Sequence, residues 1–262
     1  MCTAFVRYGK DYICGFNMDI NIGAFDWKLQ MDEKVFAVTL TMPKDLSDII
    51  PAGRVVPPEY TDFENGALRL HGVNRNGDFG NQLNNLKFTK APFEIGEHCV
   101  PLYYLVDAFI RGKHPLRDIE RYARTRKVVN LPTGSIDIAD KGMHSLLSDS
   151  KGNMMVLEPG NGFAVPTGKY AVLSNFAVME LPGDFVPENF GCYGKDRYDT
   201  ALSILRNSSD DFSVQDGLKI LDAVKQTGKW GTRLSFVYSG NENAVYYALE
   251  HDFSDIRKHR FD

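Results

Sequence analysis

The sequence predicts an α+β fold in which mainly antiparallel sheets are covered by helices. Two observations lead to this prediction: strand and helix patterns occur in separate blocks, and successive strands are joined by short turns. The blocks run as strands, two helices, strands, two helices and strands, unlike the alternating β-α-β units of parallel sheets. A chain of 262 residues can bury one large core, so we expect a single domain over residues 1–262.

The first block of strands begins near the start of the chain. Short β-branched and aromatic runs are separated by Tyr8-Gly9-Lys10-Asp11 and by Asn76-Gly77, which are good hairpin turns. A proline-rich segment over 43–64 predicts a loop that borders a pocket. The strands expected here span residues 3–8, 12–18, 34–42, 67–74 and 78–85.

Helical patterns follow in two pairs, with further strands between and after them. Pro115 suits the first turn of one helix, and Ser213 suits the N-cap of another. The helices expected span 100–112, 115–127, 196–207 and 213–227. The strands expected span 143–149, 153–158, 162–165, 170–174, 233–239 and 244–249.

Composition and charge exclude several classes of function. Hydrophobic residues make up 43% and charged residues 24% of the chain, and the formal net charge is −4, so no basic face is expected for nucleic acid or anionic lipid. The basic stretch 121–127 (RYARTRK) is expected to be a solvated helix end. No secretory signal and no apolar run near 18 residues is present, so we expect a cytoplasmic protein that does not bind membranes.

Motifs for cofactors and metals are also missing from the sequence. There is no G-x-G-x-x-G after a strand, no Walker loop, no H-E-x-x-H and no G-x-S-x-G. The six histidines show no metal-ligand spacing, and the four cysteines form no C-x-x-C pair. We therefore expect neither a metal nor an organic cofactor, and reduced thiols.

The cysteine at position 2 predicts a nucleophile. Loss of Met1 is easy before a small residue, and it would place a free α-amine and a thiol on Cys2. Their reference pKa values, about 7.7–8.0 and about 8.5, put a base and a soft nucleophile near neutral pH. The alternative interpretation is that Cys2 is a small apolar residue that starts a strand.

A nucleophile of this kind needs a group that orients the amine, donors for an oxyanion and a cation near the sulfur. Asn17 and Asp19 end the strand expected to pair with the first one, and Asn84 and Asn175 end apolar strands, where asparagine is a poor strand former. Each asparagine could instead be a turn residue that binds its own backbone.

Five motifs follow one another along most of the chain: MCT at the start, GFNMD (15–19), HGVNRNGDFGNQLNN (71–85), AVLSN (171–175), and LPGD (181–184) followed by DRY (196–198). In this order they resemble the choloylglycine hydrolase family of N-terminal nucleophile (Ntn) hydrolases, which includes conjugated bile acid hydrolases and penicillin V acylases. The resemblance implies a catalytic set of Cys2, Asp19, Asn84, Asn175 and Arg197.

The resemblance also implies a fold and a mechanism. The fold would be a four-layer αββα sandwich of two packed, mainly antiparallel sheets flanked by helices. Cys2 would be the nucleophile, Asp19 the partner of its amine, and Arg197 a cation near the sulfur. The backbone N–H of Asn84 and the side chain of Asn175 would form the oxyanion hole.

Two departures from the family pattern stand out. Phe16 replaces the family's first-strand arginine, which removes a cation that would lower the thiol pKa. LPGD follows Asn175 almost at once, without the long excursion that helps bile salt hydrolases form tetramers. The tetramer is therefore not carried over, and a homo-oligomer is left open.

The expected function is hydrolysis of a linear, non-peptide amide of an N-acylated small molecule through a Cys2 thioester. Conjugated bile acids, penicillin V and N-acyl amines or amino acids are the substrate classes that the resemblance offers. Aromatic residues near the expected pocket loops fit an apolar acyl group, although ordinary core packing explains them equally: Phe16, Phe25, Trp27, Phe63 and Phe79. Two alternatives remain, an acyltransferase that uses the same acyl-Cys2 and a non-catalytic binding protein.

Overall fold

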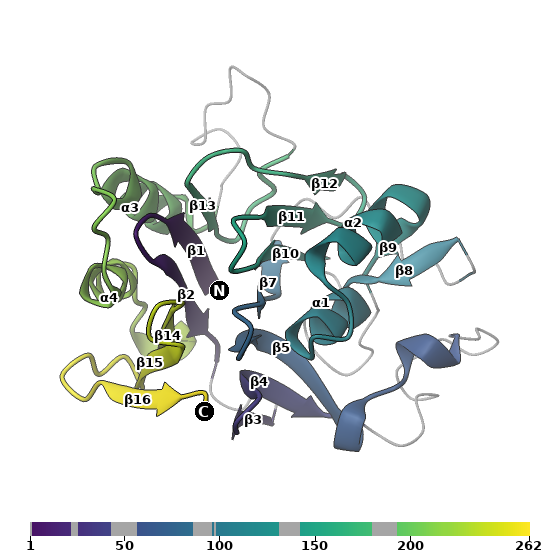
Figure 1. Ribbon diagram of the computed structural model, residues 1–262, viewed down its shortest axis with the longest axis horizontal. Helices are drawn as coiled ribbons and strands as arrows, with labels where there is room; N and C mark the ends of the chain where they lie inside the picture. The colour runs from purple at the N-terminus through teal and green to yellow at the C-terminus, as the bar shows by residue number, and fades with distance from the viewer. Residues whose placement is uncertain are drawn as a thin grey trace.

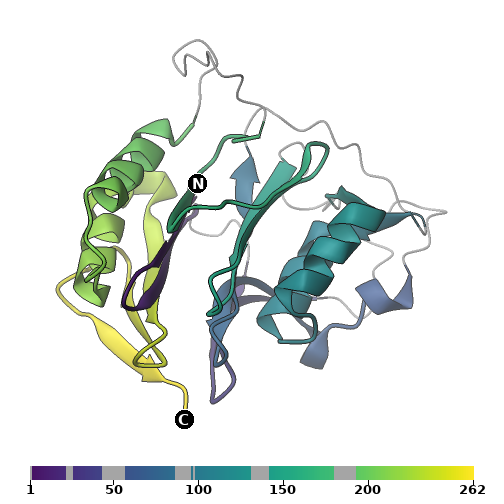
Figure 2. The same ribbon diagram turned by 45° about the horizontal axis from the view of Figure 1, so that its top comes forward.

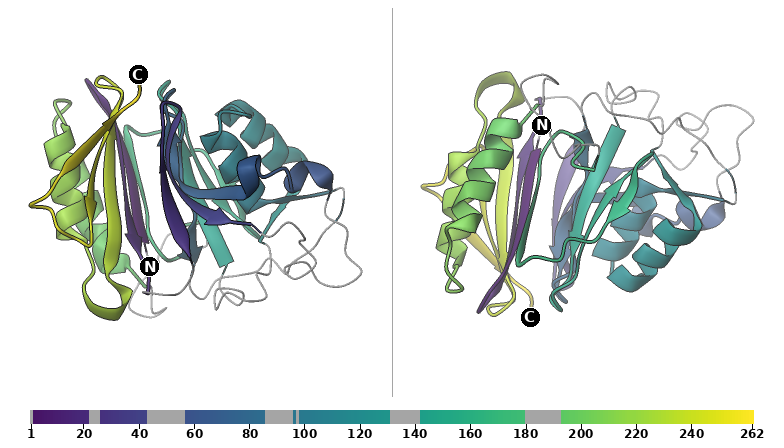
Figure 3. Two further views of the ribbon diagram at one scale, coloured as in Figure 1. Left: turned by 90° about the horizontal axis from the view of Figure 1, so that it is seen from below. Right: turned by 90° about the horizontal axis from the view of Figure 1, so that it is seen from above.

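Two antiparallel sheets pack face to face, and each carries a pair of helices on its outer side (Figures 1 and 3). The computed structural model describes residues 2–21, 26–42, 57–85, 96, 98–130, 142–179 and 193–262. The expected four-layer αββα sandwich is thereby confirmed. Met1, Phe25, Cys192, the LPGD motif and residues 43–56 of the proline-rich segment lie outside the described residues.

The first sheet has six strands and contains both the first and the last strand of the described chain. A hairpin of β1 and β2 occupies its middle, where Cys2 lies opposite Met18. In spatial order the strands are β13 (Tyr170–Leu173), β1 (Cys2–Tyr8), β2 (Tyr12–Asp19), β14 (Thr232–Ser239), β15 (Ala244–Leu249) and β16 (Arg257–Arg260).

The second sheet has eight strands, of which β7 (Leu83–Asn85) pairs with β10 beside the main path. Its main path runs through β12 (Gly162–Ala164), β11 (Met154–Glu158), β10 (Gly142–Ser148), β6 (Phe79–Gly80), β5 (Ala67–Asn74), β4 (Val35–Thr41) and β3 (Trp27–Met31). A separate parallel pair joins β8 (Cys99–Pro101) to β9 (Lys127–Val129).

Helices form the two outer layers (Figure 2). Helices α1 (Leu102–Ile110) and α2 (Leu116–Thr125) cover the eight-stranded sheet, while α3 (Lys195–Arg206) and α4 (Val214–Ala223) cover the six-stranded one. Ser213 caps α4 in a reciprocal box with Asp216, as its sequence position predicts. Among the described residues, short 3₁₀ turns span Pro58–Tyr60, Glu64–Gly66 and Gly228–Trp230.

The apolar side chains form three layers that match this architecture. Alternate residues of β1 and β2, among them Cys2, Ala4, Phe16 and Met18, point into the core between the sheets. The intervening residues, such as Phe5 and Ile13, pack under α3 and α4. Cys2 therefore starts a strand whose inner face is buried between the two sheets.

Some expectations about elements were wrong. The helix expected over 115–127 ends at Thr125, because Arg126 has extended backbone angles and the chain enters β9. Strands β3, β8, β9 and β16 were not anticipated from the sequence. Within the described residues, no helix is long and apolar enough to cross a membrane.

Candidate active site

Cys2 lies at the start of β1 with both of its backbone polar groups held by side chains from distant parts of the chain. Its nitrogen donates to Asn175 Oδ1 at 2.8 Å, and its carbonyl oxygen accepts from Arg197 Nη1 at 2.6 Å. The residue is only 5% exposed. Position 2 is therefore fixed by residues more than 170 positions away, which ordinary strand packing does not require.

Arg197 is the centre of the cluster. It lies in the first turn of α3, is 2% exposed, and reaches the end of the six-stranded sheet from the helical layer. Besides the Cys2 carbonyl, its Nη1 contacts Thr3 Oγ1 at 2.8 Å and Asp19 Oδ2 at 3.3 Å, and its Nη2 donates to Asn175 Oδ1 at 2.7 Å. One planar guanidinium thus fixes three chain segments at once.

Asp19 is a completely buried carboxylate at the end of β2. Its Oδ1 accepts from Thr232 Oγ1 at 2.5 Å, and its Oδ2 faces Arg197. Burial raises the pKa of Asp19 to about 6, although Arg197 and the Thr232 hydrogen bond act in the opposite direction. Asp19 therefore titrates close to neutral pH.

The Cys2 thiol is in an environment that favours its neutral form. Burial raises the pKa of the Cys2 thiol above its ordinary value, and the Asp19 charge adds to this effect. Arg197 and the backbone N–H of Asp19 act in the opposite direction. The proton must therefore be taken by a base close to the sulfur for the thiolate to form.

The two asparagines expected to form an oxyanion hole are in contact with each other. Asn175 Nδ2 donates to the backbone carbonyl of Asn84 at 2.7 Å. Asn84 Oδ1 is buried without a hydrogen-bond partner among the described residues. Asn17, in contrast, turns toward α4 and donates to the Leu221 carbonyl at 2.8 Å, so it does not join this cluster.

Gly194, at the start of α3, leaves the space that the Arg197 guanidinium and Ser174 occupy. It is the N-cap of α3 and has a φ of 80°, in the left-handed region. A Cβ atom built there would lie 2.3 Å from Arg197 Nη2 and 2.4 Å from Ser174 Oγ. A residue with a side chain would therefore displace the guanidinium.

Phe16, at the position where the sequence resemblance leads one to expect an arginine, lies in the core between the sheets. Its ring stacks on His71, with centroids 4.4 Å apart and planes 28° from parallel. Burial lowers the pKa of His71 to about 3, and its Nδ1 accepts from the Gln82 backbone at 3.2 Å. His71 is therefore neutral and does not replace the missing cation.

The other described aromatic residues considered from the sequence lie in two environments, one of them shared with Phe16. Phe79 is fully buried in the core between the sheets, and Trp27 packs against that core. Phe63 lies on the other side of the eight-stranded sheet, where it contacts Tyr103 of α1. The structure thus does not gather these side chains around one acyl pocket.

Sequence reasoning missed two residues of the cluster, Thr232 and Gly194. Neither belongs to a motif, and the only available signal was position: Thr232 begins the strand that pairs with β2 at Asp19, and Gly194 directly precedes α3. Among the described residues, no group of three or more His, Cys, Asp or Glu side chains could hold a metal ion.

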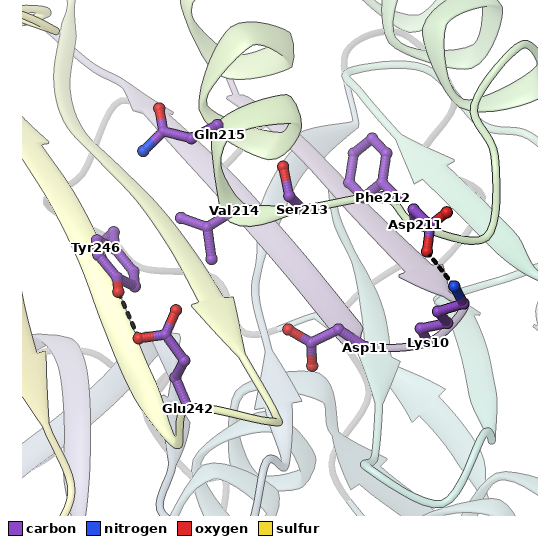
Figure 4. Close-up of a pocket in the computed structure, with 9 residues that line it drawn as sticks. All are labelled: Lys10, Asp11, Asp211, Phe212, Ser213, Val214, Gln215, Glu242 and Tyr246. Carbon is purple, nitrogen blue, oxygen red and sulfur yellow. Dashed lines mark hydrogen bonds and ion pairs between the residues drawn. The ribbon is translucent and has the colours of Figure 1, made fainter.

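A surface pocket of about 340 Å³ lies at the opposite end of β1, beside the turn to β2 (Figure 4). From Cys2 at one end of β1 to Tyr8 at the other is roughly 20 Å, and the pocket begins beyond that end. Its charged groups are paired with neighbours: Lys10 with Asp211 at 2.5 Å, and Glu242 with Tyr246 at 2.6 Å. The pocket is lined by Lys10, Asp11, Asp211, Phe212, Ser213, Val214, Gln215, Glu242 and Tyr246.

Comparison with known proteins shows the fold. A C2A mutant of conjugated bile acid hydrolase from Clostridium perfringens aligns with a TM-score of 0.62 and 16% identity, over 99% of this chain and 92% of that one. Penicillin V acylase from Agrobacterium tumefaciens aligns with a TM-score of 0.55 and 15% identity, over 95% and 83%. No protein-family model and no curated protein sequence matches. The resemblance read from the motifs is therefore confirmed at the level of the fold.

Proposed function

We propose that this chain is an N-terminal-cysteine amidase that hydrolyses the linear, non-peptide amide bond of an N-acylated small molecule through a thioester on Cys2. The observation that carries the proposal is that Asn175 and Arg197 both bind the backbone of Cys2, while the same guanidinium contacts the Asp19 carboxylate. A cysteine that merely started a strand would need neither a buried cation nor a buried carboxylate.

Activation of the nucleophile begins with removal of Met1, which turns the Cys2 nitrogen from an amide into an amine. That nitrogen lies 2.8 Å from Asn175 Oδ1, so the asparagine oxygen would orient the amine. The amine then takes the thiol proton, directly or through a water molecule. A nearby base is needed because burial raises the pKa of the thiol.

Acylation follows when the sulfur attacks the acyl carbon of the substrate. The Asn175 amide has two N–H groups, of which the Asn84 carbonyl uses one, and we assign the second to the oxyanion. The Asn84 backbone N–H is the second oxyanion donor in this assignment. The protonated α-amine gives its proton to the leaving amine, the C–N bond breaks, and water then releases the acid from Cys2.

The substrate class rests on the fold and on chemistry. The two structural neighbours are named for a conjugated bile acid and for penicillin V. We assign the same broad class to this chain, a small amide with an apolar acyl group. The absence of a cation at Phe16 argues against carrying over bile-salt preference in particular.

The test is the intact mass of the purified protein with and without a panel of N-acyl amines, N-acyl amino acids, penicillin V and conjugated bile acids. We expect loss of one methionine and a substrate-dependent acyl adduct or released amine that disappears in Cys2→Ala. Cys99→Ala is the matched control, because Cys99 is a buried cysteine in β8, outside the site. It should retain full turnover.

Two other results would redirect the proposal. Retained methionine and no turnover, even after the terminus is freed artificially, would contradict the amidase and favour a binding protein, as the loss of the arginine at Phe16 suggests. Transfer of the acyl group to an added amine in preference to water would identify an acyltransferase that uses the same thioester.

A further inference from the structure

A histidine and a glutamate are buried side by side in the eight-stranded sheet, and the proposed chemistry uses neither of them. His144 lies in β10 and Glu158 in the neighbouring strand β11, and both side chains have no exposed surface. His144 Nδ1 lies 3.4 Å from Glu158 Oε1. Such a pair in an apolar core has a cost in desolvation, so its contacts need an explanation.

Both side chains hold the stretch of chain that follows β13, residues 174–179. His144 Nε2 lies 2.6 Å from the Ser174 carbonyl oxygen, which can only accept, so this nitrogen carries a proton and donates. Glu158 Oε1 accepts from the Val178 backbone N–H at 2.7 Å, and its Oε2 accepts from that of Met179 at 3.1 Å. His144 and Glu158 therefore bind segment 174–179 near its two ends.

Asn175 lies between these two attachment points. Its neighbour Phe176 is 2% exposed and packs edge-on against Tyr198 of α3, with centroids 5.2 Å apart. Segment 174–179 thus leaves the six-stranded sheet at β13 and is fastened to the eight-stranded sheet by Glu158. Asn175 therefore lies between an attachment at Ser174 and one at Val178 and Met179.

The charge on Glu158 suits this task. Burial by itself raises the pKa of Glu158, but the neighbouring His144, together with hydrogen bonds from the Val178 N–H and Asn161, more than offsets it and holds the pKa below its ordinary value. The carboxylate is therefore ionised and accepts on both oxygens. A glutamine there would turn an NH₂ group toward one of the two backbone N–H donors.

We infer that His144 and Glu158 are positioning residues that hold segment 174–179 in place. Through this segment they fix the position of the oxyanion-binding amide of Asn175 relative to Cys2. The inference rests on the proposed function, because it is the oxyanion role of Asn175 that demands such accuracy. A catalytic group must stay within about 0.5 Å of its productive geometry. Two anchors on either side of Asn175 provide that restraint.

The test is Glu158→Gln, measured by kcat, KM and the rate of Cys2 alkylation by iodoacetamide. Alkylation forms no oxyanion, whereas amide hydrolysis does. We expect kcat to fall about tenfold, with KM and the alkylation rate within about twofold of the original chain. Asp107→Asn is the matched control, because Asp107 is a buried, ion-paired carboxylate in α1. It should lower stability and leave kcat unchanged.

A double-mutant cycle tests whether Glu158 acts through Asn175. If it does, adding Glu158→Gln to Asn175→Ala should cause no further loss of kcat. An equal tenfold loss in both backgrounds would overturn the inference. So would an unchanged kcat in Glu158→Gln, or an alkylation rate that falls as much as kcat.

Hydrogen exchange provides a readout that does not depend on turnover. Glu158→Gln should speed exchange at the Val178 and Met179 amides, while Asp107→Asn should not, and unchanged exchange would overturn the inference. If the original chain hydrolyses nothing but exchange changes as expected, the proposed function fails while the anchoring of segment 174–179 stands. Should Glu158→Gln not fold, Glu158→Asp takes its place, with an expected loss of about threefold, because it keeps the charge but is one methylene shorter.

Discussion

Asp19 and Glu158 are both buried carboxylates near Asn175, but their surroundings have opposite effects. Asp19 faces a guanidinium and a threonine hydroxyl on the helical side of its sheet, and burial still raises its pKa to about 6. Glu158 faces two backbone N–H groups, an asparagine amide and a histidine, and its pKa is held below the ordinary value.

The difference shows how local donors decide whether a buried acid can titrate. His144, with the Val178 N–H and the Asn161 amide, more than offsets the desolvation of Glu158, so its carboxylate stays ionised near neutral pH. Arg197 divides its hydrogen bonds among four acceptors, so it compensates Asp19 less completely. The carboxylate in the candidate active site is therefore the one that can change charge near neutral pH.

The largest expected effect comes from Arg197→Met. It leaves Asp19 without its cation and frees Asn175 and the Cys2 carbonyl, so we expect a loss of about 3–5 kcal/mol in unfolding free energy and at least about a hundredfold in kcat. Urea denaturation and steady-state kinetics measure the two effects. Arg69→Met is the control, because Arg69 is equally buried but pairs with Asp107 and Glu64. Its kcat should not change. An unchanged unfolding free energy in Arg197→Met would show that the fold does not need the ion pair between Arg197 and Asp19.

The next effect is the pH dependence caused by Asp19. Its folded pKa of about 6 exceeds the ordinary value of 3.8, so the folded state binds the proton more tightly than the unfolded state. The resulting contribution of Asp19 to the free energy of unfolding is fully present below about pH 4. It is lost, by about 3 kcal/mol in all, as the pH rises through 6. Asp19→Asn should abolish this slope in urea denaturation between pH 4 and 7. Activity should rise over the same interval, because only the carboxylate pairs with Arg197.

Glu158 should produce a slope of the opposite sign at lower pH. Because its folded pKa is depressed, its contribution is present above its ordinary value of 4.5 and is lost as the pH falls through the folded pKa. Glu158→Gln should therefore remove part of the acid-induced loss of stability below pH 4.5, and leave the slope near pH 6 intact. The same denaturation series measures this, and a change near pH 6 would mean that the two carboxylates are coupled.

A smaller effect is expected from Thr232→Val, which removes the hydroxyl that donates to Asp19 Oδ1. Loss of a donor to the charged form should move the midpoint of the acid limb of activity up by about 0.5 to 1 pH unit, and cost about 1 kcal/mol at pH 7. Thr3→Val is the matched control, since Thr3 Oγ1 accepts from Arg197 without touching Asp19. If the pH midpoint of activity moved equally in both variants, the change would be due to Arg197 and not to Asp19.

The smallest effect should follow Asn161→Ala. Asn161 donates to Glu158 at 3.3 Å, beside the two backbone N–H donors, and it is only half-buried. We expect less than about 0.5 kcal/mol in unfolding free energy and no change in kcat. A loss as large as that of Thr232→Val would mean that the backbone donors hold Glu158 less well than their distances indicate.

Most of the fold could be predicted from the sequence because its strands are apolar and its turns contain glycine or asparagine. The strands that were missed lack those signals. In β16 the sequence is RKHR, and β3 contains Lys28 and Gln30, so both are edge strands defined by pairing with a neighbour. The parallel pair β8 and β9 depends on tertiary packing between segments almost 30 residues apart.

The residues of the candidate site were predictable only where a motif contained them. Cys2, Asp19, Asn175 and Arg197 come from motifs, and the structure brings them into one connected set of hydrogen bonds. Thr232, His144 and Glu158 belong to no motif. A histidine and a glutamate at buried positions of two apolar strands were a signal, but their partner, segment 174–179, could not be known before the fold.

The contact between Cys2 and Arg197 has a consequence for the order of events during translation. Cys2 is held by Arg197, a residue synthesised 195 positions later. At typical elongation rates, roughly 10 to 40 s separate their appearance at the ribosome. During that interval the start of the chain cannot yet be enclosed by α3, and an aminopeptidase can reach it. Removal of Met1, as proposed above, would therefore precede the burial of Cys2, because α3 can cover the start of the chain only after Arg197 has been synthesised.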